Sequence, residues 1–144
     1  MLDKKKFYIN GQWVEPSKPN DFKVINPCNE DPCAIISLGS KEDTNVAVKS
    51  AKDAFETWKE TTKEDRLNYL EKLLSVYKKR SGEMAKAISL EMGAPMDWAT
   101  EVQTASGQLH LEDFILRLKD FEFDEHFNKK SNNHICYEPI GVCG

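Results

Sequence analysis

The chain has 144 residues and a formal net charge of −4, with 40% hydrophobic and 31% charged residues. This length is sufficient for one domain with a core, and the composition is typical of a soluble globular protein. The acidic balance argues against a nucleic-acid-binding protein, which usually carries a concentrated basic surface. No apolar stretch is long enough to span a bilayer, and the N-terminus lacks the hydrophobic segment of a signal peptide, so we expect a cytoplasmic location without membrane association.

Residues 1–39 are predicted to form β segments. The pair Asn10-Gly11 lies between two short runs of apolar residues and is typical of a type I′ turn, because both central positions need a positive φ. A β-hairpin is therefore expected at residues 7–14. The basic run at residues 4–6 is expected only to solvate the start of the chain. Two further strands are predicted, at residues 22–25 and 34–38.

Residues 40–120 are predicted to be helical, because apolar residues recur there every three or four positions. Ser40 is expected to cap the first helix, and Thr62 with Asp65 three residues later is expected to cap the second. Ser81 is interpreted as the cap of a third helix, which Gly93 ends. A fourth helix is predicted at residues 95–119. The apolar stripes of these helices are expected to form the core; their larger members include Trp58, Leu73, Trp98, Leu109 and Leu116.

Residues 121–144 return to strand-like patterns. Residues 121–124 alternate in polarity, residues 128–133 read as a polar turn, and residues 135–138 read as a strand. The last residues, 140–144, alternate apolar residues with glycine, and this pattern predicts a strand that continues into a larger structure. We therefore expect the chain to be truncated relative to a complete domain.

Four cysteines occur in the chain, and none forms a C-x-x-C pair, so no disulfide framework is expected; they are Cys28, Cys33, Cys136 and Cys143. His126, His134 and Cys136 could in principle recruit zinc, since the His134-x-Cys136 spacing places both side chains on one face of a strand. Two ligands do not make a zinc site, and we interpret these residues as ordinary strand and loop residues.

Enzyme motifs are scarce in this sequence. It contains no glycine-rich phosphate loop and no nucleophile elbow. Cys136 and Cys143 are weak nucleophile candidates, because neither has a visible base or helix N-terminus to activate it. The residues alone therefore predict a mixed α/β protein without catalytic apparatus of its own.

Six segments, in order and with similar gaps, resemble conserved motifs of the aldehyde dehydrogenase superfamily. They cover nearly the whole chain and lie at residues 9–14 (INGQWV), 25–30, 47–58, 66, 90–95 (LEMGAP) and 138–144 (EPIGVCG). The resemblance implies an α/β fold, namely the N-terminal portion of the aldehyde dehydrogenase fold. That portion has a β-hairpin, oligomerisation strands and about four helices, and it is truncated before the Rossmann-like nucleotide-binding core is complete.

The same resemblance implies an oxidoreductase that converts an aldehyde to a carboxylic acid with NAD or NADP through a cysteine thiohemiacetal and thioester. In the family the catalytic and cofactor-binding residues follow the segment that resembles residues 138–144. None is therefore assigned in this chain, which is expected to be inactive alone and to bind no cofactor. Residues 121–144 resemble oligomerisation strands that lead into the cofactor domain, and a complete enzyme is expected to be a homo-dimer or homo-tetramer.

The resemblance also implies one possible ion site. Some members of the family bind a monovalent cation, and its ligands here would be the backbone carbonyls of Val24 and Ile25 and the carboxylate of Glu91. Hard oxygen donors suit such an ion. The alternative is that Glu91 bonds nearby backbone at the end of its helix. Two other functions stay open from the residues: a non-catalytic assembly module derived from the family, and a small metal-binding protein.

Overall fold

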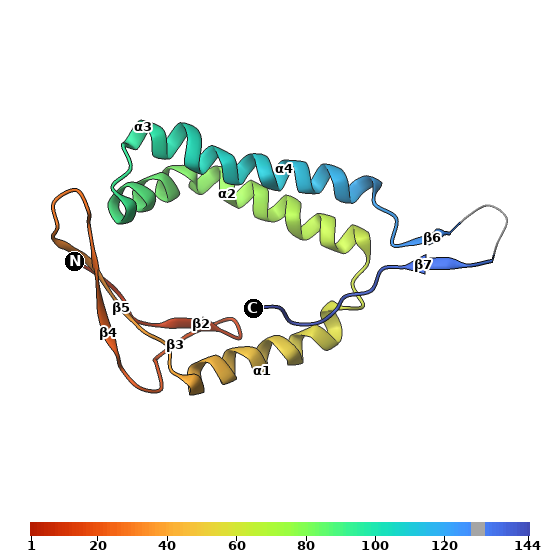
Figure 1. The fold of residues 1–144 in the computed structure, drawn as a ribbon, viewed down its shortest axis with the longest axis horizontal. Helices are drawn as coiled ribbons and strands as arrows, with labels where there is room; N and C mark the ends of the chain where they lie inside the picture. Colours follow the sequence, from red (N-terminus) through yellow and green to blue (C-terminus); the bar gives the residue numbers. More distant parts are fainter. Residues whose placement is uncertain (128–131) are drawn as a thin grey trace.

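The computed structural model describes residues 1–127 and 132–144 and is drawn in Figure 1. Most of the predicted polar turn at 128–133 lies outside the described residues. The described strands are β1 (Leu2–Lys4), β2 (Phe7–Ile9), β3 (Gln12–Val14), β4 (Asp21–Ile25), β5 (Pro32–Ser37), β6 (Asp124–His126) and β7 (His134–Cys136). The described helices are α1 (Lys41–Trp58), α2 (Lys63–Met92), α3 (Met96–Trp98) and α4 (Ala105–Asp120), with a π-helical segment, η1 (Ala99–Thr104), between α3 and α4.

The elements form an open arrangement with two long edges. Helices α2 and α4 pack side by side along one edge, and α1 lies with the β2–β3 hairpin along the other (Figure 1). The β6–β7 hairpin projects from the end at which α1 and α2 are joined. None of the helices in the described part of the chain is long and apolar enough to cross a membrane.

The N-terminal strands form two small sheets. The β2–β3 hairpin is confirmed, with φ of 51° at Asn10 and 75° at Gly11, as a type I′ turn requires. Strands β4 and β5 are also confirmed, and they pair antiparallel. Strand β1 is a difference from the sequence prediction, because the start of the chain pairs parallel with β5, with Leu2 opposite Ala34. The residues around the basic run therefore form part of a sheet edge.

The two helix starts predicted from capping residues are confirmed. Ser40 caps α1 through a capping box, in which the Ser40 hydroxyl accepts from the Asp43 N–H and the Asp43 carboxylate accepts from the Ser40 N–H. Thr62 and Asp65 form the same reciprocal pair at the start of α2. The Asp43 carboxylate also accepts a hydrogen bond of 2.8 Å from the backbone N–H of Ser17. It therefore ties the loop before β4 to the start of α1.

The helix break predicted at Ser81 is wrong, because α2 is one continuous helix of 30 residues. The Ser81 hydroxyl donates to the carbonyl of Lys78, 3.1 Å away, within the same helix. A serine satisfied by a preceding carbonyl does not need to cap, and the following Gly82 weakens a helix without ending it. The predicted end of the helix at Gly93 is confirmed, with Gly93 in the left-handed conformation.

The predicted helix at 95–119 is present as α3, η1 and α4 in succession, but its π-helical middle was not predicted. Opposite this segment, the Tyr77 hydroxyl of α2 donates to the carbonyl of Thr104 at 2.9 Å. Gly107 provides the space for that ring, since an added Cβ would lie 2.9 Å from Cζ of Tyr77. The contact fixes the register of α2 against η1 and α4.

The prediction that the apolar stripes form the core is wrong for most of their large members. Among the described residues the buried hydrophobic residues are only Ala34, Ala85, Ala99 and Ile115. The stripe residues Trp58, Leu73, Trp98, Leu109 and Leu116 are between 45% and 62% exposed. An amphipathic helix buries its stripe only where another element covers it, and α1 has its main contact with β2 alone. The stripes therefore stay exposed where no described element packs on them.

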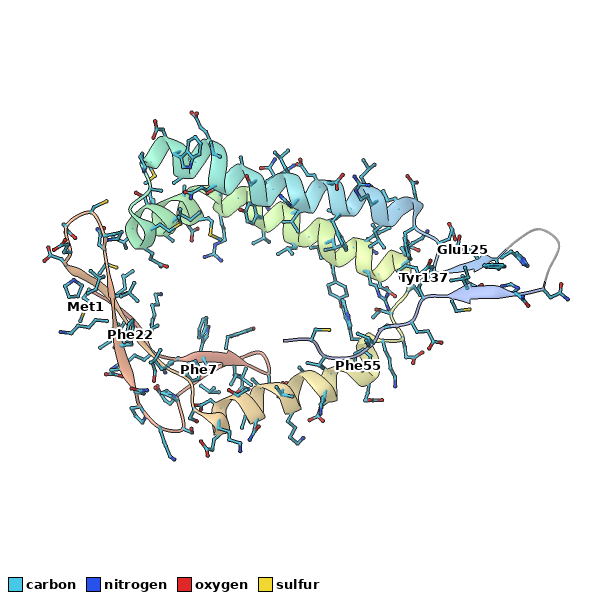
Figure 2. The ribbon with its side chains drawn as sticks, viewed as in Figure 1. Met1, Phe7, Phe22, Phe55, Glu125 and Tyr137 are labelled. Carbon is cyan, nitrogen blue, oxygen red and sulfur yellow. The ribbon has the colours of Figure 1, made fainter. Side chains whose placement is uncertain are left out.

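The base of the β6–β7 hairpin is an aromatic cluster. The ring of Phe121 lies 4.9 Å from that of Phe123 and 5.3 Å from that of Tyr137, and the Arg66 guanidinium lies 5.5 Å from the Phe123 ring. Figure 2 labels Tyr137 at the end of the hairpin that is nearer to the helices. Arg66 also donates to the carbonyl of Lys59 at the end of α1. This one side chain therefore links the α1–α2 turn to the hairpin.

The ends of the predicted C-terminal strands differ from expectation. Strand β6 begins at Asp124, because Phe121 and Phe123 are engaged in the aromatic cluster. Residues 140–144 have no regular structure in this chain, and the Ile140 side chain is 94% exposed, so a strand that continues into a larger structure stays a prediction. A strand needs a partner ladder for its backbone groups, and no described strand lies beside this segment.

Candidate functional site at the carboxyl end of α2

The end of α2 packs against the loop that follows β4. Gly93 ends the helix with φ of 74°, and its N–H donates to the carbonyl of Ser89 at 3.0 Å. A Cβ added to Gly93 would lie 2.8 Å from Cγ of Pro27 and 3.1 Å from Sγ of Cys28. Glycine is thus required twice at this position, once for the left-handed conformation and once for the close approach of the loop.

The loop itself is closed by hydrogen bonds around Asn26. The Asn26 side-chain oxygen accepts from the N–H of Cys28 at 2.9 Å, and the Asn26 carbonyl accepts from the N–H of Glu30 at 2.8 Å. The Asn26 N–H donates to the carbonyl of Asp31, also at 2.9 Å. These bonds make a compact turn that presents Pro27 and Cys28 to the helix end.

The three predicted cation ligands lie on the two elements that this contact joins. Val24 is half-buried and Ile25 is 45% exposed near the end of β4, two or three residues before Pro27. Glu91 is exposed, two residues before Gly93. Ile25 lies opposite Pro32, which has no N–H to donate to the Ile25 carbonyl. The Val24 carbonyl lies in the β4–β5 ladder, where Val24 is opposite Ala34, and it also accepts a bond from the Cys33 thiol at 3.4 Å.

The alternative role of Glu91 does not occur in the structure. Among the described residues its carboxylate has no hydrogen-bond or ion-pair partner, so it does not bond the nearby backbone. An acidic side chain in the last turn of a helix faces the negative end of the helix dipole and is stabilised by a positive partner. The cation site at Val24, Ile25 and Glu91 stays a prediction.

The cysteines form no nucleophilic site. All four are free thiols, and no described base accompanies Cys143, whose thiol donates to the carbonyl of Gly141 at 3.8 Å. Burial and the neighbouring Asp124 carboxylate raise the pKa of the Cys136 thiol, which favours its protonated form. Within residues 1–127 and 132–144, no group of three or more His, Cys, Asp or Glu side chains is arranged to hold a metal. In the described residues, His126, His134 and Cys136 are therefore not arranged as a three-ligand zinc site.

Sequence reasoning missed the contacts that join distant segments here. The approach of Pro27 to Gly93 has no local signal, because the two residues lie far apart in the chain. The Gly93 position was identified as a helix end, but only the structure shows what its missing side chain accommodates.

Known proteins match this chain over nearly all of its length. The family model described as the aldehyde dehydrogenase family matches residues 13–144. A 3-succinoylsemialdehyde-pyridine dehydrogenase from a Pseudomonas species is 39% identical over 100% of this chain and 30% of its own length. The chain thus spans less than a third of that relative.

Solved structures agree with this match. An aldehyde dehydrogenase from Bartonella henselae superposes with a TM-score of 0.90 at 51% identity, covering 92% of this chain and 28% of the other. Aldehyde dehydrogenase C from Pseudomonas syringae, a mutant solved with NAD+ and octanal, superposes with a TM-score of 0.83 at 33% identity, covering 86% of this chain and 26% of the other.

The superposed structures are aldehyde dehydrogenases, and this chain has the fold of their N-terminal portion. The chain belongs to the aldehyde dehydrogenase family.

Proposed function

We propose that this chain forms the N-terminal portion of an enzyme that oxidises an aldehyde to a carboxylic acid with NAD+ or NADP+. The observation that carries the proposal is the family match over residues 13–144, together with a coverage of about 30% of the relatives' length. The Pseudomonas syringae relative, solved with NAD+ and octanal, supports the cofactor and the substrate class.

The residues of this chain do not fit a nucleotide or an activated nucleophile. The described glycines lie in the β2–β3 turn, inside α2 and α4, at the end of α2, in the loop before α1 and in the irregular C-terminal segment, and no group of them precedes a helix as a glycine-rich phosphate loop would. No step of the reaction is therefore assigned to a residue of this chain. Its contribution is structural: it supplies helices and strands against which the rest of the enzyme packs.

The exposed apolar stripes support this structural role. Side chains such as Trp98 in α3 and Leu109 and Leu116 in α4 are more than half exposed. An independent assembly module would bury such large apolar side chains. The β6–β7 hairpin has two strands only, and its open edges suit strand addition in a homo-dimer or homo-tetramer. We expect the purified chain alone to self-associate through these surfaces, whereas a free-standing module would be monodisperse and would melt cooperatively.

The test combines an activity assay with the nucleotide sequence that follows the codon for Gly144. The purified 144-residue chain, incubated with NAD+ or NADP+ and octanal, should give no increase in absorbance at 340 nm. The protein encoded by the complete reading frame should give one under the same conditions. Activity of the chain alone would contradict the assignment of a purely structural role. A stop codon directly after Gly144 would favour the assembly module.

The cation site is part of the same proposal. The carbonyls of Val24 and Ile25 and the carboxylate of Glu91 would hold a monovalent cation where the loop after β4 meets the end of α2. The ion would neutralise the carboxylate at the negative end of the helix dipole. Its role would be to fix the loop against the helix, and its effect should appear in stability as well as in activity.

A further inference from the structure

One face of the β6–β7 hairpin carries two histidines directly opposite each other. His126 and His134 are paired across the antiparallel strands, and their ring centroids are 4.2 Å apart. The backbone hydrogen bonds on either side run from Phe127 N–H to the Asn133 carbonyl and from Tyr137 N–H to the Phe123 carbonyl. Because bonded and non-bonded pairs alternate along an antiparallel ladder, His126 and His134 form a non-hydrogen-bonded pair. Side chains approach most closely at such pairs.

A neighbouring carboxylate orients one of these rings. Asp124 Oδ1 lies 2.8 Å from Nδ1 of His134, on the same face of the hairpin. An ionised carboxylate only accepts hydrogen bonds, so the proton of the neutral imidazole resides on Nδ1 and the lone pair on Nε2. A histidine backed by a carboxylate in this way is the usual arrangement of a metal-binding imidazole.

The remaining neighbours limit the site to two protein ligands. Cys136 lies opposite Asp124, with one cross-strand pair between it and the two histidines, and it is not part of the histidine pair. No third His, Cys, Asp or Glu in the described residues is placed to complete a site. His134 is 44% exposed, so water can reach the other coordination positions.

We propose that His126 and His134 form a two-imidazole chelate for a late divalent transition metal such as Ni²⁺, Cu²⁺ or Zn²⁺, with water in the remaining positions. Imidazole nitrogen suits these ions, whereas Mg²⁺ and Ca²⁺ prefer oxygen ligands. The bound ion cross-links β6 and β7. Asp124 is a positioning residue that acts through His134 and does not touch the metal.

The experiment follows the three histidines of the chain by NMR during a titration with NiCl₂. The imidazole signals of His126 and His134 should broaden together at the lowest Ni²⁺ concentrations. His110, on the separate helix α4, provides an internal control and should broaden only later. MgCl₂ should leave all three signals unchanged. Equal broadening of the three histidines would overturn the proposal.

Variants separate the chelate from general binding by thiols and carboxylates. We expect His126→Asn and His134→Asn each to weaken Ni²⁺ binding at least about 10-fold, because a single imidazole remains. The His110→Asn control should bind as the parent chain does. Asp124→Asn should weaken binding about 10-fold while both rings still broaden, as expected for a positioning residue. Unchanged affinity in His134→Asn, with circular dichroism showing an intact fold, would also overturn the proposal.

Discussion

Replacing Gly107 by alanine should destabilise the chain, although the same change usually stabilises a helix. In a helix interior, alanine is favoured over glycine by about 1 kcal/mol. At Gly107, however, the new Cβ would overlap the hydroxyl of Tyr77 and lie 2.9 Å from its Cζ. The ring must then move, and its hydrogen bond to the Thr104 carbonyl is lost.

The magnitude follows from three opposing contributions. The helix preference stabilises by about 1 kcal/mol, the lost hydrogen bond costs about 1 kcal/mol, and the overpacked contact costs about 1–3 kcal/mol. The expected net effect of Gly107→Ala is a destabilisation of about 1–3 kcal/mol. Gly82 is the matched control, because it lies inside α2 with nothing within 4 Å of an added Cβ. Gly82→Ala should therefore stabilise by about 1 kcal/mol.

Urea unfolding at low protein concentration, followed by far-UV circular dichroism, measures both effects. A double-mutant cycle with Tyr77→Phe tests the cause. Tyr77→Phe alone should cost about 1 kcal/mol, and it should cost much less once Gly107→Ala has already displaced the ring. If Gly107→Ala and Gly82→Ala stabilise equally, the packing of Tyr77 against Gly107 is not the reason for the glycine.

Three further predictions concern the joints between segments. Hydrogen bonds from the backbone N–H of Ser17, and then of Ser40, lower the pKa of Asp43 to about 2 from an ordinary value of 3.8. The stability that the ionised carboxylate adds is full above about pH 4 and should be lost as the pH falls from about 4 to about 2. Acid titration followed by circular dichroism should show this loss in the parent chain and a flatter pH dependence in Asp43→Asn. Gly93→Ala should lower the free energy of unfolding by at least about 1–2 kcal/mol, because alanine is strained at the left-handed φ and its Cβ meets Pro27. If Gly93→Asn lowers it equally in urea unfolding, the contact with Pro27 rather than the φ angle dominates. When NaCl or KCl replaces choline chloride at constant ionic strength, the midpoint of thermal unfolding should rise for the parent chain but not for Glu91→Gln. Identical shifts in both proteins would contradict the cation site.

Local hydrogen-bonding requirements made several elements predictable from the sequence. Ser40 and Thr62 each satisfy the first free N–H groups of a helix together with an acidic residue three positions later. Asn10 and Gly11 tolerate the positive φ of a tight hairpin, and Gly93 tolerates the φ that ends α2. In each case the residues that determine the structure are neighbours in the chain, so no distant contact is needed to recognise them.

Distant contacts decided the rest. Ser81 resembles a helix start, but its hydroxyl bonds within α2, and the helix continues because it packs against η1 and α4. The candidate cation ligands were grouped by resemblance to a family, and only the approach of Pro27 to Gly93 brings their elements together.

The sequence by itself determined the starts of α1 and α2, the end of α2, the turn of the β2–β3 hairpin, and which side chains form apolar stripes. The tertiary structure alone decided which stripes are covered, why Gly107 lacks a side chain, and which two histidines share a face. The physical reason is that caps and turns depend on hydrogen bonds between neighbours in the chain, whereas burial depends on whether another layer is present to exclude water.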